Sequence, residues 1–290
     1  FIIKKVQNSI LQCINCIDMF FKYSFCLGLF FFIAACTPKP YSKTNKVYKQ
    51  QVKKFGKTIA TYPLPAVADS IQMAEQWVGT TNLGMRKPNF VIIHHTAQNS
   101  CEQTLKTFTL PRTQVSAHYV ICRNGSVHQM LNDYLRAWHA GNSKWGSNTD
   151  INSASIGIEL DNNGFEPFST EQINSLIQLL DVLKKKHQIP AANFIGHGDI
   201  APTRKNDPSI LFPWKQLADK GFGLWYDALP TMAQPDSNFN TLHALRIIGY
   251  DIKDTTAAIR SFKRHFLQDS TRKMNEIDRM VLFNLYKKYL

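Results

Sequence analysis

The sequence is poor in acidic residues. It holds 21 Asp and Glu against 34 Lys and Arg, which gives a formal net charge of +13. Such a charge favours an anionic partner, but nucleic acid, a membrane surface and a cell wall all satisfy it. Glycine and proline are scarce as well, with 14 and 13 of 290 residues, so a collagen-like or low-complexity disordered chain is excluded. A chain of this length can bury one sizeable core and a smaller second unit.

Cysteines are too few for a disulfide-stapled fold. Of the six in the sequence, three lie before residue 36, in a segment that we predict to be removed. Cys36, Cys101 and Cys122 remain. Their spacing leaves open either one bridge between the last two or two free thiols.

The densest apolar run of the sequence lies near its N-terminus. Residue 1 is Phe, and we interpret the residues before Met19 as an upstream extension or a translation artefact. The stretch "MFFKYSFCLGLFFFIAAC" then combines one lysine, an apolar run and small residues before Cys36, which is typical of an export signal. The small residues resemble a bacterial lipobox, so we expect residues 1–36 to end in a lipidated cysteine. An uncleaved transmembrane helix is the alternative, but the run is short for a span and stops at Cys36.

The following segment lacks acidic residues altogether. Residues 37–60 contain seven lysines and no Asp or Glu. We predict a solvated Lys-rich tether between the lipid anchor and a folded domain. Thr37, rather than an aspartate, follows Cys36. Under the usual retention rule this favours the outer membrane, with the protein facing the periplasm.

Residues 61–229 mix apolar patterns of both strand and helix period, which predicts an α/β domain with a mixed central β-sheet flanked by helices. Asn124-Gly125 is a strong signal for a two-residue hairpin turn. Glu159 lies opposite the apolar face of its strand, and Ser169 or Thr170 begins a helix with a capping-box pattern. The predicted strands cover residues 90–94 and 153–160, and residues 193–202 are predicted as a strand that runs into a loop. The predicted helices are 63–79, 100–110 and 169–187, and the predicted hairpin is 117–131.

The C-terminal part differs from the preceding domain, with a linker composition followed by helical periodicity alone. Residues 230–240 have the Pro, Ser and Asn content of a linker. Residues 241–290 predict a small all-α domain of three helices. Its expected core positions are Leu242, Leu245, Ile248, Ile259, Phe262, Phe266, Ile277, Val281, Leu282 and Leu285.

Three residues at distant positions have the chemistry of one metal site. His94 ends a predicted strand, His197 follows another, and Asp207 comes ten residues later. Two imidazoles and a carboxylate with an open fourth position are typical of catalytic zinc. A lone histidine at a strand end is more often an ordinary surface residue, and His95 is expected to be one, because successive strand residues face opposite sides.

The chain resembles a known family from about residue 75 to residue 228. The motifs "VIIHHTA", "SAHYVI", "AWHAGNSKW", "SIGIEL" and "GHGDIAPTRKNDPSILFPWKQLA" stand in the order found in zinc-dependent N-acetylmuramoyl-L-alanine amidases of type 2. Those enzymes share their fold with phage lysozyme-type amidases and animal peptidoglycan-recognition proteins. The C-terminal stretches "LHALRIIGYDI" and "AIRSFKRHF" resemble, more weakly, the peptidoglycan-binding domain of wall hydrolases.

The resemblance implies roles for individual residues. It makes His94, His197 and Asp207 the zinc ligands, Glu159 the general base and Lys205 the cation that stabilises the oxyanion. Without it, Glu159 would be interpreted as a solvent-facing strand residue and Lys205 as an ordinary surface lysine.

The resemblance also implies a substrate groove. Trp138 and His139 are expected to line it, although a tryptophan packed under a loop fits the sequence equally well. His118 and Asn142 are weaker candidates. Ser209 departs from the family loop, which often has glycine there, and leaves every ligand position filled.

The leading hypothesis is therefore an exported, lipid-anchored zinc amidase. It would hydrolyse the amide between N-acetylmuramic acid and L-alanine in peptidoglycan or muropeptides, during cell-wall turnover or recycling. The alternatives are a non-catalytic peptidoglycan-binding lipoprotein and a structural lipoprotein with a vestigial zinc site. The expected partners are peptidoglycan and, through Cys36, a membrane; no nucleic acid is expected, and we expect a monomer.

Overall fold

A computed structural model describes residues 39–60 and 79–290. The predicted export signal, the lipidation site at Cys36 and most of the helix expected at 63–79 lie outside these residues. The chain divides into two compact units, Phe1–Thr80 and Thr81–Leu290. Within the described residues, no helix is long and apolar enough to cross a membrane.

The first unit contributes one described helix, α2 (Ser42–Ala60), and none of its residues is buried. The segment predicted as a solvated tether is therefore helical over most of its length.

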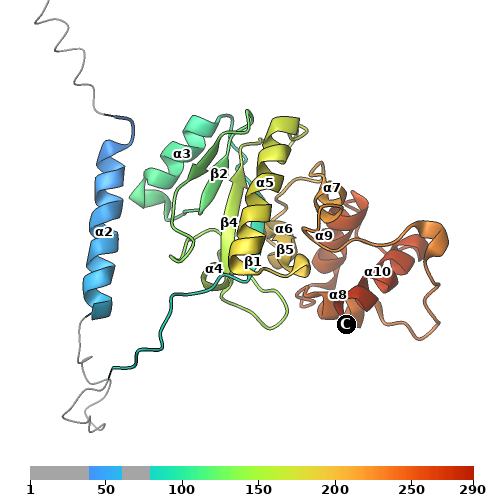
Figure 1. Cartoon of the computed structure of the whole chain (residues 1–290). Helices are drawn as coiled ribbons and strands as arrows, with labels where there is room; N and C mark the ends of the chain where they lie inside the picture. The colour runs from blue at the N-terminus through green and yellow to red at the C-terminus, as the bar shows by residue number, and fades with distance from the viewer. Residues whose placement is uncertain (1–38, 61–78) are drawn as a thin grey trace, which may run out of the picture. The chain divides into compact units, whose positions relative to one another are not determined.

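The second unit is built on a five-stranded mixed sheet with the strand order β3-β2-β4-β1-β5 (Figure 1). Parallel pairs join β1 to β4 and β5, and β2 to β4, whereas β2 and β3 form the predicted antiparallel hairpin. The α/β class is confirmed. The strands are β1 (Phe90–His95), β2 (Tyr119–Ile121), β3 (Val127–Gln129), β4 (Ser155–Leu160) and β5 (Phe194–Gly196).

Helices and short 3₁₀ turns surround the sheet. The helices are α3 (Cys101–Thr109), α4 (Ile151–Ala154), α5 (Thr170–His187), α6 (His197–Ile200), α7 (Trp214–Ala218), α8 (Thr241–Ile248), α9 (Thr255–Leu267) and α10 (Glu276–Tyr289), and the 3₁₀ turns are Pro111–Thr113, Ala191–Asn193 and Leu229–Thr231.

The two faces of the sheet bury different side chains. On β1, Val91 and Ile93 join a core that includes α5, whereas Ile92 joins a second core made largely by the C-terminal helices. Because successive strand residues alternate, His94 shares the face of Ile92. On β4, Ile158 belongs to the α5 core, so its neighbour Glu159 also faces the side of Ile92.

Local signals set the helix boundaries. The side chain of Ser169 accepts a hydrogen bond from the backbone of Gln172 and begins α5 where the sequence predicts. The expected reciprocal capping bond is replaced, because the Gln172 amide donates to the carbonyls of Ile121 and Asp161 instead. After β5 the chain enters the one-turn helix α6 rather than the expected loop.

The three C-terminal helices form as predicted, each with an Asn or Asp cap. Their buried core contains Leu245, Phe262 and Leu285, as expected, but Ile277 was wrongly placed there and is 54% exposed. Helix α9 packs against α6 and α7. The C-terminal helices thus share a core with the sheet. The linker 230–240 and the separate domain 241–290 stay predictions from the sequence.

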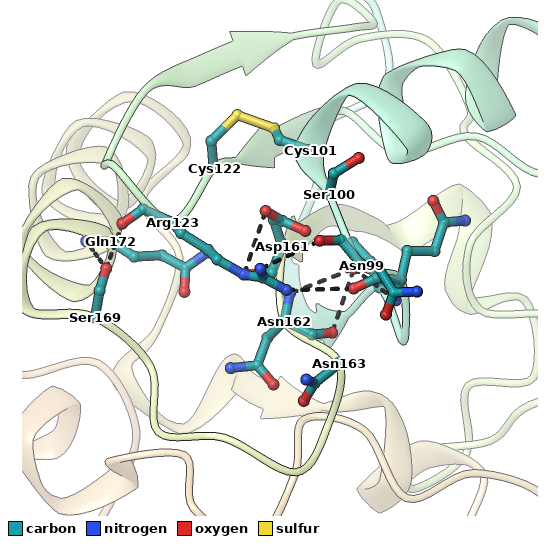
Figure 2. Close-up of polar contacts among 12 residues, drawn as sticks. Asn99, Ser100, Cys101, Cys122, Arg123, Asp161, Asn162, Asn163, Ser169 and Gln172 are labelled. Carbon is teal, nitrogen blue, oxygen red and sulfur yellow. Dashed lines mark hydrogen bonds and ion pairs between the residues drawn. A yellow bond between two sulfur atoms is a disulfide. The ribbon is translucent and has the colours of Figure 1, made fainter.

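A disulfide joins Cys101 at the start of α3 to Cys122 just after β2, which resolves the open question of the two thiols (Figure 2). The neighbouring Arg123 makes ion pairs with Asp161 and Glu166, at 3.6 and 2.9 Å. Its guanidinium also donates to the backbone carbonyl of Asn99 at 3.2 Å. Bridge and arginine together hold α3 beside the carboxyl ends of β2 and β4.

Candidate active site

The three predicted metal ligands meet at the carboxyl ends of neighbouring parallel strands. His94 lies on β1, His197 is the first residue of α6 directly after β5, and Asp207 lies on the loop that follows. The Nδ1 atoms of His94 and His197 are 2.9 Å apart, and Asp207 Oδ2 lies 3.1 and 3.0 Å from them. All three side chains are buried. The sequence pattern thus corresponds to one compact group of ligand atoms.

A chain of hydrogen bonds determines which nitrogen of His94 carries the proton. The Ser155 hydroxyl donates to the Ile151 carbonyl at 2.6 Å, so it accepts from His139 Nε2 at 3.2 Å. His139 Nδ1 is then left to accept from His94 Nε2, at 3.0 Å. We therefore assign a free lone pair to Nδ1 of His94, on the side of the other two ligand atoms.

His197 is oriented in the same way. Its Nε2 donates to the backbone carbonyl of Ala140 at 3.1 Å, which leaves the lone pair of Nδ1 facing His94 and Asp207. Histidines that ligate metals characteristically donate their second ring nitrogen to a carbonyl or similar acceptor. Two lone pairs and a carboxylate oxygen in mutual contact repel one another unless a cation lies between them, so the donor set fits a metal ion such as zinc.

The charge states also suit a metal. Burial, with the nearby His197, lowers the pKa of His94 to about 4, so its imidazole is neutral near pH 7. Asp207 Oδ2 lies against both Nδ1 atoms, and a cation bound between them would hold its carboxyl in the ionised form. Neutral imidazole and ionised carboxylate are the forms that bind metal.

Glu159 stands beside the ligand group because of the strand register. It pairs with His94 across β1 and β4, and its Oε1 lies 4.0 Å from His94 Nδ1. Burial and then the charge of Asp207 raise its pKa to about 8. A cation bound at His94 would oppose that shift and favour the carboxylate form.

A cavity of about 380 Å³ opens over these groups. Besides the metal ligands it is lined by Glu159, Lys205, Trp138 and His139, the residues that the family resemblance implies. Trp138 is 53% exposed, so it is not packed under a loop. The structure therefore brings the predicted catalytic residues and two of the predicted substrate residues to one site.

Two predicted substrate residues do not line this cavity. His118 has no exposed surface: its Nδ1 accepts from the backbone of Gly157, and its Nε2 contacts Arg86. The side chain of Asn142 is also absent from the lining, and the backbone carbonyl of this residue accepts from Arg204 at 2.9 Å.

Sequence reasoning missed part of the site. Arg204 lines the cavity and donates to the carbonyls of Ala140 and Asn142, so it ties the Trp138 loop to the loop that carries Asp207. Its place beside Lys205 in a motif was visible, but its backbone partners were not. Gly157 was also missed: a Cβ at this position would collide with the ring of His139.

The largest omission is Asp199, a buried carboxylate two residues after His197. Its Oδ2 accepts from the Gly196 backbone at 2.8 Å and from His265 Nδ1 at 2.7 Å. Its Oδ1 accepts from the Tyr250 hydroxyl at 2.8 Å. His265 and Tyr250 belong to the C-terminal helical part, so this part holds the turn that presents His197.

Helix α9 also contacts the loop from His197 to Asp207, here called the ligand loop. The Ser261 hydroxyl donates to the Gly198 carbonyl at 2.8 Å. Arg264 donates to the carbonyl of Asn206, also at 2.8 Å, directly before the third ligand. The C-terminal helices therefore fix both ends of the loop from His197 to Asp207.

Comparisons with known proteins agree with this geometry. The sequence profile of the N-acetylmuramoyl-L-alanine amidase family matches residues 84–210. The chain is 36% identical over 206 residues to N-acetylmuramoyl-L-alanine amidase AmiD of Escherichia coli, covering 61% of this chain and 74% of that protein. The chain belongs to the N-acetylmuramoyl-L-alanine amidase family. It is accordingly an amidase and a hydrolase.

Solved structures of family members show the same fold. A complex of the E. coli enzyme with anhydro-N-acetylmuramic acid-L-Ala-D-γ-Glu-L-Lys has a TM-score of 0.63 at 31% identity, covering 73% of this chain and 93% of that one. AmpDH3 of Pseudomonas aeruginosa gives the same TM-score at 27% identity, covering 76% and 99%.

Proposed function

We propose that this amidase uses zinc, held by His94, His197 and Asp207, to hydrolyse the bond between N-acetylmuramic acid and L-alanine in muropeptides. The observation that carries the proposal is the convergence of three ligand atoms, with Glu159 4.0 Å from one of them, in one open cavity. The substrate class is supported by the muropeptide fragment bound to the E. coli relative.

Each residue of the proposed site has a separate role. Zinc held at the three ligands would acidify a water molecule and polarise the scissile carbonyl. Glu159 accepts the proton of the attacking water on its carboxylate and delivers it to the leaving amine nitrogen. The Lys205 ammonium stabilises the negative charge that develops on the carbonyl oxygen. Trp138 offers an exposed aromatic face at the cavity wall, suited to a sugar ring.

The fixed tautomers of His94 and His197 prepare the site to bind the metal ion before the reaction starts. His139 and the Ala140 carbonyl hold the two imidazoles with Nδ1 free, so His94 and His197 need no proton rearrangement to bind the ion. Such orienting partners commonly change metal affinity by about 10- to 100-fold.

The location of the enzyme is part of the proposal. The export-like leader, the lipobox-like residues before Cys36 and the relationship to E. coli AmiD support a lipid-anchored enzyme of the outer membrane facing the periplasm, which acts in turnover or recycling of the wall.

A muropeptide digest tests the activity. We expect residues 37–290 to release free stem peptide from purified anhydro-muropeptides and to contain one zinc per chain. Glu159→Gln should keep the zinc and lose about 10²- to 10⁴-fold in rate. Asp207→Ala should lose both zinc and activity.

Glu171→Gln, the same change at an exposed glutamate in the first turn of α5, is the matched control and should behave as wild type. Zinc bound by wild type without peptide release, together with retention on purified sacculi, would favour the non-catalytic binding protein instead.

A further inference from the structure

Helix α2 separates its apolar and basic residues onto opposite faces. Tyr48, Val52, Phe55 and Ile59 follow one another at intervals of three or four residues, so they form one stripe along the helix. The stripe is open within the described part of the chain: Phe55 is 53% exposed and Ile59 84%. Figure 1 shows α2 as one continuous helix in the N-terminal unit.

The opposite face is rich in lysine. A period of 3.6 residues per turn places six lysines on the side away from the stripe, and the helix contains no acidic residue. They are Lys43, Lys46, Lys49, Lys53, Lys54 and Lys57.

The apolar stripe and the lysine-rich face of α2 together fit one kind of partner surface. A helix with an apolar stripe and a lysine-rich face suits the interface of a bilayer, where the stripe enters the acyl boundary and the lysines meet anionic head groups. A glycan wall offers anions but no apolar phase for Phe55 and Ile59. A second copy of α2 could cover the stripe, but it would bring two strongly positive helices together.

We propose that α2 lies in the surface of a bilayer that contains anionic phospholipid, with the stripe Tyr48, Val52, Phe55 and Ile59 as its membrane face. This interaction is independent of the amidase reaction, because it uses residues of the N-terminal unit alone. A helix bound in this way would add a second membrane contact beside a lipid at Cys36 and would hold the Lys-rich segment against the bilayer.

Vesicle sedimentation tests the proposal. Residues 37–290, without lipid, are mixed with vesicles of phosphatidylglycerol and phosphatidylcholine, or of phosphatidylcholine alone. We expect binding to the anionic vesicles that falls with added salt, and at least tenfold weaker binding to the neutral ones. The double change Phe55→Gln with Ile59→Gln should weaken anionic-vesicle binding at least tenfold. Lys46→Gln with Lys53→Gln should weaken it and flatten its salt dependence.

Phe165→Gln is the matched control, because Phe165 is an apolar residue with 91% exposure in the other unit. It should bind vesicles as wild type does. Muropeptide hydrolysis in solution should be equal in all these variants, which shows that the catalytic unit is folded and separates this result from failure of the proposed activity.

Three results would overturn the proposal. They are no binding to anionic vesicles at low salt, binding that survives loss of the apolar stripe, and vesicle-independent dimerisation that Phe55→Gln abolishes. Capture of wild type by purified sacculi, lost in the lysine variant without any vesicle binding, would assign the basic face to the wall instead.

Discussion

Lys263 is the most deeply buried cation among the described residues, with 2% of its side chain exposed. Its ammonium contacts Asp278 Oδ2 at 2.6 Å and Asp269 Oδ2 at 2.7 Å. It also donates to the Thr271 hydroxyl at 2.6 Å. This one side chain therefore joins α9 to the turn after it and to the start of α10.

Lys263→Met is expected to lower the free energy of unfolding by about 3 kcal/mol, because it leaves buried Asp278 without its cation. Lys263 is also the main cause of the lowered pKa of Asp269, about 2. A lowered folded pKa adds stability that is complete above the unfolded value and lost as the pH falls through the folded value. The difference between wild type and variant should therefore shrink between about pH 5 and pH 2.

Urea unfolding at pH 7, 5 and 3 measures this effect. Lys253→Met, the same change at an exposed lysine of the same helical part, should alter stability by less than about 0.5 kcal/mol. A difference independent of pH would show that Asp269 takes no part.

Single residues also show what sequence can reveal. The period of two along β4 places Glu159 opposite the apolar residues of its strand, and its family motif suggests a role. Its contact with His94 depends on the register between β1 and β4, which local patterns do not encode. His118 illustrates the reverse case, since a histidine between polar and apolar neighbours gives no local sign that it is fully buried.

At the scale of elements, α9 contacts residues that neighbour two of the predicted metal ligands. It supplies His265 to Asp199 and Arg264 to Asn206, and the ring of His265 stacks on Trp214 with 3.9 Å between centroids. The Tyr250 hydroxyl, from the segment between α8 and α9, completes the contacts of Asp199.

We expect Tyr250→Phe to weaken zinc binding by at most about tenfold, the low end of the effect of groups that contact a ligand directly. The reason is that Asp199, which holds the Gly196 backbone before His197, loses a partner. Competition with a chromogenic chelator measures the affinity, and thermal unfolding of the metal-free protein measures stability separately. Tyr286→Phe, a tyrosine of α10 that is not among the partners of Asp199, is the control.

A Tyr250→Phe protein that loses stability but keeps its zinc affinity would reduce this contact to a purely structural one. Lys263→Met is a further comparison, because it disturbs α9 at a position away from Asp199.

Elements differ in how well sequence predicts them. The β2–β3 hairpin, α5 after Ser169 and the three capped C-terminal helices follow from local signals, and all were predicted. The hairpin turn is longer than the two residues predicted at Asn124-Gly125, because the last strand pair is Ile121 with Val127. The docking of α9 on the ligand loop was not, because it joins residues more than sixty positions apart. The C-terminal pattern indicated three helices, but nothing local shows which surface such helices cover.

The whole molecule combines a catalytic unit with a basic N-terminal segment, and its net charge of +13 is concentrated partly there. We expect labelled palmitate to be incorporated into the protein in a bacterial host and to be lost in Cys36→Ala. The wild-type protein should fractionate with the outer membrane.

Cys101→Ala with Cys122→Ala is the control for this labelling, because it removes two cysteines and keeps Cys36. Label that persists in Cys36→Ala would contradict the predicted lipobox. If the wild-type protein is labelled but is recovered in the inner membrane, the lipid anchor at Cys36 is supported and the predicted outer-membrane location is contradicted.

The disulfide between Cys101 and Cys122 has a consequence for purified samples. His128 lies close enough that one atom from each of these three side chains falls within 4.8 Å of the others. Protein produced in a reducing cytosol would present two thiols and an imidazole there, a donor set that zinc also favours. The zinc content measured on such material would include zinc bound at this second site, which is an artefact of the preparation. Only protein with the disulfide formed gives a zinc stoichiometry that reports the His94 group alone.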